Sequence, residues 1–483
     1  MTRFPKIVAL LGFLVAAGCR DSYPGVVPPE GIVYYPVGLA VRQVAPSAEP
    51  GKEYGATQLV VVSSNFDIRY EEPDGGTVQI ADPDASPDTS TGQPMTLYPG
   101  GFIRTASFGG KVAVAEAACQ PGWPLCPSGC SQLAADPAVA AGGAKVLFTS
   151  RSSQFLYDLD LSPEGALSCN GNCVMQQGVE LLDPYGVALV CNSSGGTDRA
   201  QAMFTYLNGP NGQGWLTRLD LLTGTYTTLA VGQPPTFNIA YDPAGDRVYF
   251  TGKVVLTYAP IRWFNPSIAN QVSGGYEYPP FSSISTTTSV LGSVATAIGV
   301  SNDRQRLYVS LVLYDADLFA NTGSLYSMGG ALAVFSLTPN ASFQPSLALL
   351  QLVPTCAGSG DLSVLPARPG KGDLVAMTCD QQGTLVLYDD DLGGIIRFVG
   401  LDPATGLPAL GLSPFGIASE PIDPRRAIKT PASPAYGVSP CVEGGRCTRL
   451  YVGAFMDNWI NVLELDPDQP ASMTLVKRIG RGP

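Results

Sequence analysis

Short runs of apolar residues, bounded by Gly, Pro, Asn or Asp, recur along the chain from residue 36 almost to its end. The most regular kind often begins with a charged residue and occurs at residues 59–62, 145–149, 202–206, 247–251, 306–310, 373–378 and 449–453. Runs this short, separated by turn residues, predict β-strands rather than strands that alternate with helices.

Three further kinds of run accompany the first. One opens with the pattern Pro-x-[Gly/Asn]-aliphatic-Ala, at residues 36–40, 184–188, 235–240 (one residue longer) and 414–418. Another ends in aspartate, at 78–82, 156–160, 215–220 and 460–466, and a last apolar run closes several units, at 226–231, 347–353 and 474–479. Four strands per unit, in seven units, predict an all-β fold with a single seven-bladed β-propeller. Two β-sandwich domains are the rival architecture, because regular strand spacing fits them as well.

The repeating unit, at about 65 residues, is longer than a compact propeller blade, so loop insertions are required. We expect them at residues 118–143, 266–288 and 419–440. The sequence allows two ways of closing the ring. Residues 32–35 pair with the last unit, or residues 474–479 complete that unit alone.

The N-terminus carries an export signal. Arg3 and Lys6 precede an apolar segment at residues 7–17, which is too short to span a bilayer as a permanent helix. Residues 15–19, Val-Ala-Ala-Gly-Cys, resemble a bacterial lipobox, although Ala16 stands where that signal usually has Leu. The resemblance implies cleavage before Cys19 and a lipid on the Cys19 sulfur. An ordinary secretory signal with an incidental cysteine is the alternative.

These signals divide the chain into three parts. Residues 1–18 are expected to be a lipoprotein signal peptide, residues 19–30 a lipidated cysteine with a Pro-rich tether, and residues 31–483 the propeller domain. The protein is therefore expected to be exported and held by its lipid at the cell envelope, in the outer membrane.

The amino-acid composition limits the partners and the catalytic or metal sites that the chain can have. The chain of 483 residues has 55 Gly and 42 Pro, which suit many turns, and only 14% charged residues. Its net charge of −12 argues against a nucleic-acid partner. It has no histidine, which excludes Ser-His-Asp catalysis and histidine metal ligands.

Ten cysteines remain after Cys19: Cys119, Cys126, Cys130, Cys169, Cys173, Cys191, Cys356, Cys379, Cys441 and Cys447. An oxidising compartment favours disulfides over thiolate metal sites, so we treat all ten as disulfide candidates and assign no metal ligand. Cys441 and Cys447 flank a short loop that a bridge could close, and Cys356 with Cys379 is a second expected pair. The full connectivity does not follow from spacing.

One family resemblance concerns the repeats. Residues 449–453, Arg-Leu-Tyr-Val-Gly, followed by residues 457–466, Asp-Asn-Trp-Ile-Asn-Val-Leu-Glu-Leu-Asp, resemble the YVTN repeat of surface-layer and lactonase-like β-propellers. Residues 306–310 and 247–251 repeat the first half of this pattern. The resemblance implies the propeller fold. Lactonase-like members use carboxylates, Arg, Asn or His in their active sites, sometimes around a metal. Because this chain has no His, such an active site could here contain only Asp, Glu, Asn or Arg. No particular residues can be carried over.

Three acidic clusters are weak candidates for Ca²⁺, and we expect solvated turns there because no EF-hand spacing follows. They are Asp389, Asp390 and Asp391; Asp315 and Asp317 with Asn321; and Asp82 and Asp84 with Asp88. Arg247, Arg306 and Arg449 begin equivalent strands, and we expect them to pair with turn aspartates rather than to bind an anionic ligand. Trp123, Trp215, Trp263 and Trp459 could stack on sugars, but packing alone accounts for four tryptophans.

The functional expectation is a noncatalytic, lipid-anchored binding or scaffold module of the cell envelope. It would be a monomer, with an envelope protein or a glycan as partner, no resident cofactor and no catalytic residue. The alternative is a lactonase-like hydrolase that uses a carboxylate-held metal in the central funnel.

Overall fold

A computed structural model of the chain describes part of its 483 residues. The described residues are 26–44, 56–70, 74–117, 130–152, 154–169, 173–176, 182–192, 199–232, 235–242, 245–252, 261–264, 272–276, 290–323, 327–337, 347–400, 409–420, 436–437, 439–441 and 446–480. Cys19, Cys119, Cys126 and Trp123, together with the expected signal peptide and most of the tether, lie outside these ranges.

The described strands form seven antiparallel sheets, each built from four consecutive strands, and the second sheet has a fifth strand. These sheets are the blades of a seven-bladed β-propeller. Blade 1 comprises β1 (Pro36–Gln43), β2 (Thr57–Ser63), β3 (Gly76–Ala81) and β4 (Leu97–Thr105); blade 2 comprises β5 (Gly109–Ala115), β6 (Ala144–Ser150), β7 (Phe155–Leu161), β8 (Leu167–Ser168) and β9 (Val174–Gln176). Blade 3 comprises β10 (Leu182–Asn192), β11 (Arg199–Asn208), β12 (Gly214–Asp220) and β13 (Tyr226–Gly232); blade 4 comprises β14 (Thr236–Asp242), β15 (Arg247–Gly252), β16 (Ile261–Phe264) and β17 (Val272–Tyr276).

The second half of the ring continues the series. Blade 5 comprises β18 (Val290–Val300), β19 (Arg306–Asp315), β20 (Ser327–Ser336) and β21 (Ala348–Pro354); blade 6 comprises β22 (Ser359–Val364), β23 (Leu374–Cys379), β24 (Thr384–Asp389) and β25 (Gly394–Val399). Blade 7 comprises β26 (Pro414–Ser419), β27 (Thr448–Ala454), β28 (Trp459–Asp466) and β29 (Gln469–Ile479). The helices described are short: η1 (Thr89–Thr91), η2 (Ser131–Ala135), α2 (Pro137–Ala140), η3 (Pro210–Gly212) and α3 (Ala316–Thr322).

The strand predictions are confirmed in detail. All seven runs of the most regular kind are the second strands of the seven blades, including the run at residues 202–206. The four Pro-x-[Gly/Asn] runs are first strands. One insertion is wrong in part, because residues 266–288 contain β17, the outer strand of blade 4.

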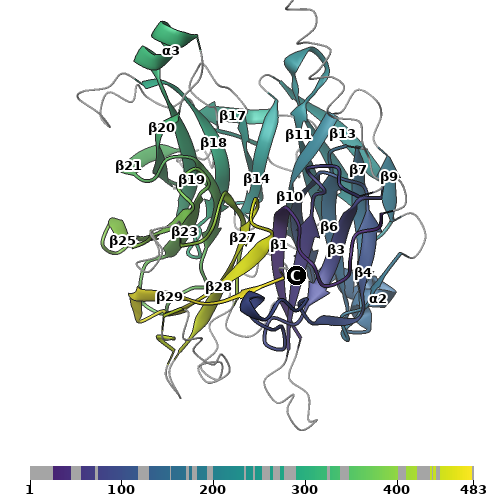
Figure 1. Cartoon of the computed structure of the whole chain (residues 1–483). Helices are drawn as coiled ribbons and strands as arrows, with labels where there is room; N and C mark the ends of the chain where they lie inside the picture. Colours follow the sequence, from purple (N-terminus) through teal and green to yellow (C-terminus); the bar gives the residue numbers. More distant parts are fainter. Residues whose placement is uncertain are drawn as a thin grey trace, which may run out of the picture.

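The ring closes without exchanging a strand between its ends. The strand β29 completes blade 7 from its own chain, as the second of the two closures proposes. Residues 32–35 instead pass between blades 7 and 1, where the Val33 N–H donates to the Gly480 carbonyl at 2.7 Å. Figure 1 shows the C-terminus beside β1. The two ends of the described chain therefore meet at this seam.

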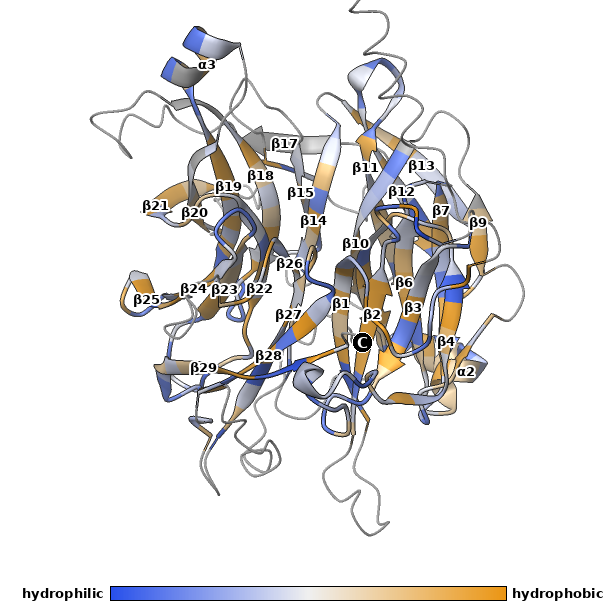
Figure 2. Cartoon of the chain, viewed as in Figure 1, coloured by the Kyte–Doolittle hydropathy of each residue, from blue (hydrophilic) through white to orange (hydrophobic). Residues whose placement is uncertain are grey.

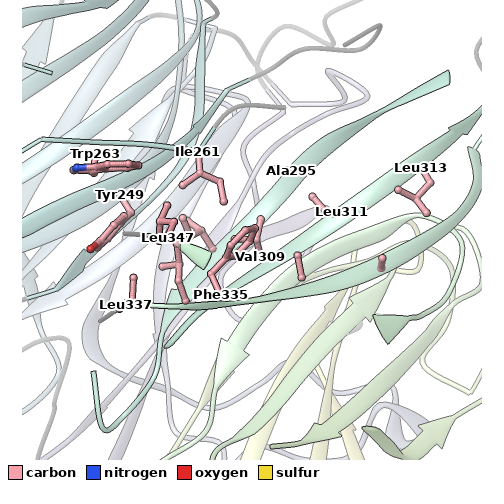
Figure 3. Packing of buried hydrophobic residues seen from close by; sticks show 14 residues of the cluster. Tyr249, Ile261, Trp263, Ala295, Val309, Leu311, Leu313, Phe335, Leu337 and Leu347 are labelled. Atoms are coloured by element: carbon pink, nitrogen blue, oxygen red, sulfur yellow. The ribbon is translucent and has the colours of Figure 1, made fainter. Parts of the chain in front are cut away.

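The hydrophobic core lies between neighbouring blades. Strands that face this core on both sides are apolar, and strands at the outer edge are more polar. The strands β2 and β24 are buried along their whole length, whereas the outer strand β13 is mostly exposed. Figure 2 shows β2 coloured largely as apolar. Between blades 4 and 5, Tyr249 and Trp263 pack with Val309 and Phe335 (Figure 3). Burial of both faces of a strand favours an apolar run without polar alternation, as the sequence has.

Four disulfides lie among the described residues: Cys130–Cys191, Cys169–Cys173, Cys356–Cys379 and Cys441–Cys447. The last two are the pairs that the spacing suggests. Cys169–Cys173 joins the two short strands β8 and β9 that both pair with β7. In the described part of the chain, none of the helices has the length and apolar character needed to traverse a bilayer.

Candidate functional site

The seven inner strands surround the axis of the ring, and each shows the same irregularity. Their pairing with the second strand shifts register near its start, for example between Pro36 and Gly38 in blade 1 and between Pro414 and Ile417 in blade 7. Such a bulge adds one residue to the inner strand. The residue just before the register is regained is Lys111, Gly186, Asn238, Asp361 or Gly416 in blades 2, 3, 4, 6 and 7, and in blades 1 and 5 we compare Gly38 and Ala297, at which the register is regained.

The glycines at this position allow neighbouring inner strands to approach closely. A Cβ on Gly38 would lie 2.6 Å from the Gly110 carbonyl oxygen of blade 2, and one on Gly186 would lie 2.9 Å from the Phe237 oxygen of blade 4. In blade 4 the Asn238 amide fills the equivalent place and donates to the Thr296 carbonyl of blade 5 at 2.9 Å. A Cβ on Gly416 would likewise lie 3.0 Å from the Val37 oxygen of blade 1, so three Gly and one Asn of the set serve the packing of blade against blade.

Lys111 and Asp361 are the two charged members of the set. Their side chains, 13% and 12% exposed, form an ion pair between blade 2 and blade 6. These blades are not neighbours, so the pair spans the interior of the ring. The same Asp361 carboxylate also accepts a hydrogen bond from the Ile417 N–H of blade 7 at 3.2 Å.

Aromatic rings surround this ion pair. The Lys111 ammonium lies 5.5 Å from the centre of the Phe415 ring, a distance that favours a cation–π contact. Tyr185 and Phe237 stack with their ring centres 4.9 Å apart. Burial raises the pKa of the Tyr185 hydroxyl far above its ordinary value, and the nearby Asp361 charge raises it further, so Tyr185 stays neutral.

An aromatic cluster lies on the face where the inner strands begin, which we call the entry face. It consists of Tyr35, Phe66, Phe108, Phe415 and Phe455. The Phe66 and Phe455 ring centres are 5.3 Å apart, and Phe455 lies 6.3 Å from Phe415. These rings lead from the surface, where Phe66 is 53% exposed, to the ion pair in the channel.

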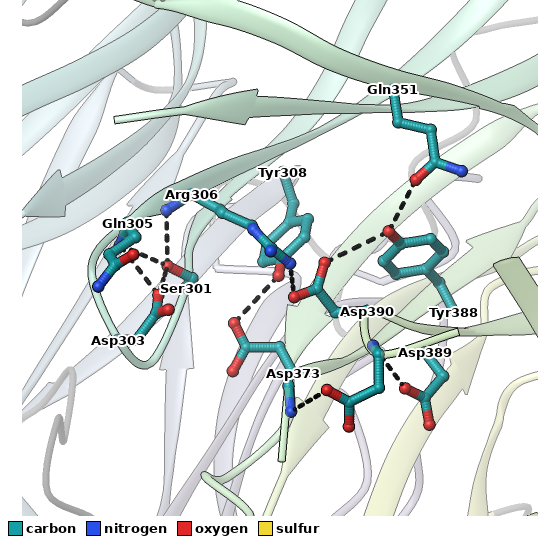
Figure 4. A network of polar contacts seen from close by, with 12 residues as sticks. Ser301, Asp303, Gln305, Arg306, Tyr308, Gln351, Asp373, Tyr388, Asp389 and Asp390 are labelled. Carbon is teal, nitrogen blue, oxygen red and sulfur yellow. Dashed lines mark hydrogen bonds and ion pairs between the residues drawn. The ribbon is translucent and has the colours of Figure 1, made fainter. Parts of the chain in front are cut away.

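The repeated arginines form structural contacts, as predicted. Arg449, 1% exposed, bonds Glu464 at 2.8 Å and Asp84 of blade 1 at 2.5 Å. Arg306 pairs with Asp390 of the next blade, beside the hydrogen bond from the Tyr308 hydroxyl to Asp373 (Figure 4). The Arg247 guanidinium lies near Asp242, against the turn at Gly245.

The expectation of a solvated turn at residues 389–391 is wrong for Asp389. Its carboxylate is 4% exposed and contacts the Arg368 guanidinium at 3.2 Å, since blade 6 supplies that arginine from the turn before β23. Asp390 pairs with Arg306, and Asp391 accepts from the Gly372 N–H at 2.7 Å. The acidic run is thus neutralised by its neighbours rather than arranged around a cation.

The other acidic clusters also stabilise turns. Asp82 accepts from the Asp84 and Ala85 N–H groups, and Asp88 caps η1. Asp315 accepts from the Asp317 N–H at the start of α3. These carboxylates therefore stabilise the turns and helix ends beside them.

Of the three described tryptophans, Trp215 is half-buried, and the other two lie within packing contacts. Trp263 and Trp459 are 7% and 8% exposed. The Trp459 ring lies against the Arg478 guanidinium, which is 4.7 Å from the ring centre. Neither ring therefore presents an open face to a sugar.

In the described residues, one group has metal-ligand atoms close together: Cys441, Cys447 and Glu464. The two sulfurs are bonded to each other, and Glu464 is paired with Arg449. This donor set does not suit a metal ion, because the sulfurs are not thiolates.

Three carboxylates of the described residues have raised pKa values, and in Asp373 burial is the main cause. Burial raises the pKa of the Asp158 carboxyl to about 6. The nearby Lys145 charge lowers this pKa, whereas the Asp160 charge raises it. Burial likewise raises the pKa of Asp380, in the turn after β23, to about 6. All three lie outside the set of residues at the channel axis.

Sequence analysis missed the central ion pair. The signal was present as a departure from the repeat: the motif position that holds Gly or Asn in four blades holds Lys111 in blade 2 and Asp361 in blade 6. Aligning all seven inner strands would have identified two charges at positions that face the axis.

The chain matches no family model and no curated protein sequence. Similarity to solved structures is distant. Hydrazine synthase of Kuenenia stuttgartiensis is 10% identical, with 91% of this chain and 97% of that chain covered and a TM-score of 0.49. A Lactobacillus plantarum protein is 15% identical, with 80% and 88% covered and a TM-score of 0.44.

A protein from Bacteroides uniformis, named provisionally as a 6-phosphogluconolactonase, is 14% identical, with 76% of this chain and 94% of that chain covered and a TM-score of 0.40. The strand order of the chain itself defines the class: an all-β, seven-bladed β-propeller.

Proposed function

We propose that this propeller is a noncatalytic binding or scaffold module, exported and held at the outer membrane by a lipid on Cys19. We also propose its kinship with the YVTN, lactonase-like propellers. The lipobox-like residues 15–19 support the anchor, and the four disulfides agree with an oxidising compartment. An envelope protein or a glycan is the proposed partner of the monomer.

The observation that carries the noncatalytic assignment is the set of seven residues at the channel axis. A hydrolase that used a carboxylate-held metal would need several Asp, Glu or Asn oxygens converging there. The set has one carboxylate, Asp361, already paired with Lys111, and one amide, Asn238, engaged with the next blade. Such residues bind the blades to one another.

Mass spectrometry of the N-terminal peptide tests the anchor. We expect Cys19 as the first residue, with a diacylglyceryl group on its sulfur. A Cys19→Ser variant should leave the membrane fraction or retain residues 1–18. A mature N-terminus elsewhere, or an unmodified Cys19, contradicts the lipid anchor.

A hydrolysis assay tests the noncatalytic assignment against the lactonase alternative. The purified protein is incubated with a panel of lactones, with added Ca²⁺, Mn²⁺ or Zn²⁺ and again with EDTA. We expect the background rate under every condition. Hydrolysis that EDTA abolishes and that Asp361→Asn reduces would establish the hydrolase instead.

A further inference from the structure

Three donor atoms meet in blade 7, on the face opposite the entry face. They are the sulfurs of Cys441 and Cys447 and a carboxylate oxygen of Glu464, and they lie within 4.8 Å of one another. Cys447 directly precedes β27, and Glu464 lies in β28, which pairs with β27. The strand β27 runs toward the entry face, where Ala454 pairs with Pro414 at the start of β26. The donors therefore lie at the other end of the blade.

All three donors are shielded from solvent. Cys441, Cys447 and Glu464 are 7%, 1% and 1% exposed. In the oxidised chain the two sulfurs are bonded to each other and offer no thiolate to a metal. Reduction leaves two thiols in the same place, beside the carboxylate. Two thiolates and a carboxylate are ligands that Zn²⁺ takes, and tetrahedral coordination at its usual bond lengths sets neighbouring ligand atoms about 3.5 to 3.8 Å apart.

The Glu464 carboxylate is already held in orientation by its neighbours. The Arg449 Nε donates to one oxygen at 2.8 Å, and the Ser439 hydroxyl donates to the other. The Cys441 N–H in turn donates to the Ser439 hydroxyl oxygen at 3.1 Å. Ligating carboxylates at metal sites are themselves hydrogen-bonded in this way, which fixes the ligand and tunes its affinity for the ion.

The charges around the three donors also suit a cation. The Arg449 guanidinium interacts with three carboxylates, those of Asp84, Glu420 and Glu464. Lys477 is the second cation of this group. Three carboxylates against two cations leave a negative excess, which two thiolates would increase. A divalent ion would therefore offset buried negative charge in the reduced chain.

We propose that Cys441, Cys447 and Glu464 form a Zn²⁺ site when the Cys441–Cys447 bond is reduced, and that oxidation of the two thiolates releases the ion. This redox-controlled site goes beyond the proposed function and does not depend on the lipid anchor. In either state a bond through the sulfurs, S–S or S–Zn–S, holds residue 441 against the start of β27.

The electrons and protons of the switch balance. A dithiol reductant gives two electrons to the Cys441–Cys447 bond and closes to a disulfide itself, and its two protons pass to the cysteine sulfurs. Zn²⁺ displaces these protons when it binds. Oxidised glutathione reverses the change, because it takes two electrons from the thiolates and leaves as two molecules of reduced glutathione.

The test uses Co²⁺ in place of Zn²⁺, because thiolate ligands give Co²⁺ an ultraviolet charge-transfer band whose intensity reports the number of sulfurs bound. The full-length protein is reduced under nitrogen with a phosphine, which becomes a phosphine oxide with oxygen from water. It is then titrated with Co²⁺. We expect a band of two thiolates per chain, which Zn²⁺ removes by displacement and oxidised glutathione removes by restoring the disulfide. Protein that has not been reduced should give no band.

Variants locate the band. Cys441→Ser with Cys447→Ser should abolish it. Cys356→Ser with Cys379→Ser is the matched control, because this pair is equally buried, at 3% and 0% exposed, and should leave the band unchanged. Ser439→Ala, which keeps the Arg449–Glu464 pair, should lower the affinity for Co²⁺ by about tenfold.

Three results would overturn the site. A band that persists in Cys441→Ser with Cys447→Ser assigns the ion to other cysteines. A pair that stays oxidised in the folded protein, or a reduced chain without the near-ultraviolet circular dichroism of the folded one, shows that no folded thiol form exists to bind the ion. Equal Co²⁺ affinity in Ser439→Ala and the unsubstituted protein excludes Glu464 as the oriented ligand. None of these readouts involves Cys19, so each leaves the proposed function intact.

Discussion

Lys111 and Asp361 place two charges near the axis of a ring whose other equivalent positions are Gly, Ala or Asn. Removing two ions from water is costly, and their attraction offsets the cost only where further hydrogen bonds complete the site. The Ile417 N–H supplies one to Asp361, and the Phe415 ring lies beside Lys111. The pair thus links blades 2, 6 and 7.

Lys111→Met should destabilise the protein by about 3 kcal/mol, because it leaves the Asp361 charge largely buried without its partner. Adding Asp361→Leu should restore part of the loss, so the double variant loses less than the two single variants together. Denaturant unfolding of the four proteins measures this coupling. Strict additivity would show that the two side chains do not interact.

Asp380 predicts a pH dependence of stability. Burial raises its pKa from 3.8 to about 6, so the folded chain holds a proton that the unfolded chain loses earlier as the pH rises. Its ionisation therefore costs stability progressively from about pH 4 to pH 6, and the cost is fully present above that window. Asp380→Asn should stabilise the protein by about 1 kcal/mol at pH 7.5, after allowance for solvent screening, and not at all at pH 3.5.

Thermal unfolding across that pH range provides the measurement for Asp380→Asn. Asp468→Asn is the matched control, because the Asp468 side chain is 48% exposed and pairs with Lys371. It should bring no gain at pH 7.5. A gain from Asp380→Asn that is the same at both pH values would show that ionisation of the buried carboxyl is not its cause.

At the scale of the elements, the inner strand determines how tightly blades pack. Its bulge directs one residue toward the next blade, and Gly38, Gly186 and Gly416 leave room for the backbone there. The outer strands have the opposite character, with exposed and more polar faces, as β13 shows. Sequence tolerance should therefore increase from the axis outward within each blade.

Gly38→Ala should cost about 2 kcal/mol, because its Cβ would lie 2.6 Å from the Gly110 carbonyl and the two inner strands would have to separate. Gly329→Ala in β20 is the control, since nothing lies within 4 Å of the added Cβ. The control should be neutral or slightly stabilising. Denaturant midpoints that change equally for the two variants would argue against close packing at the axis.

At the scale of the whole molecule, the seam between blades 7 and 1 joins the ends of the chain. Arg449 of blade 7 reaches Asp84 of blade 1, the Lys477 ammonium donates to the Pro83 carbonyl at 3.1 Å, and Val33 bonds Gly480. None of the described strands is exchanged across this seam, so these polar contacts and the apolar cluster around Val33 and Ile479 hold the ring closed.

Arg449→Met should therefore open the seam. It leaves Glu464, 1% exposed, without its cation, at a cost of about 4 kcal/mol. Arg446→Met is the control, because Arg446 and its partner Asp468 have side chains 32% and 48% exposed, and it should cost less than about 1 kcal/mol. Limited proteolysis should release an N-terminal fragment sooner from Arg449→Met than from Arg446→Met. Equal protease resistance would show that this arginine does not hold the seam.

The sequence by itself determined the strands, their grouping into seven blades and the expected export signal. Strands buried on both faces need apolar runs, and the turns between them need Gly, Pro, Asn or Asp, so these features are local and readable. The prediction failed where a contact depends on another part of the fold. Asp389 was expected in a solvated turn, because no residue close to it in the sequence indicates that Arg368 pairs with it.

Only the tertiary structure decided which distant residues meet. Lys111 and Asp361 are 250 positions apart, and Phe66 and Phe455 are farther still, yet each pair is in contact. Closing the ring brings every inner strand to one axis and the last blade to the first, a geometry set by the packing of all seven blades together. The central ion pair, the seam and the aromatic cluster on the entry face therefore exist only in the closed ring.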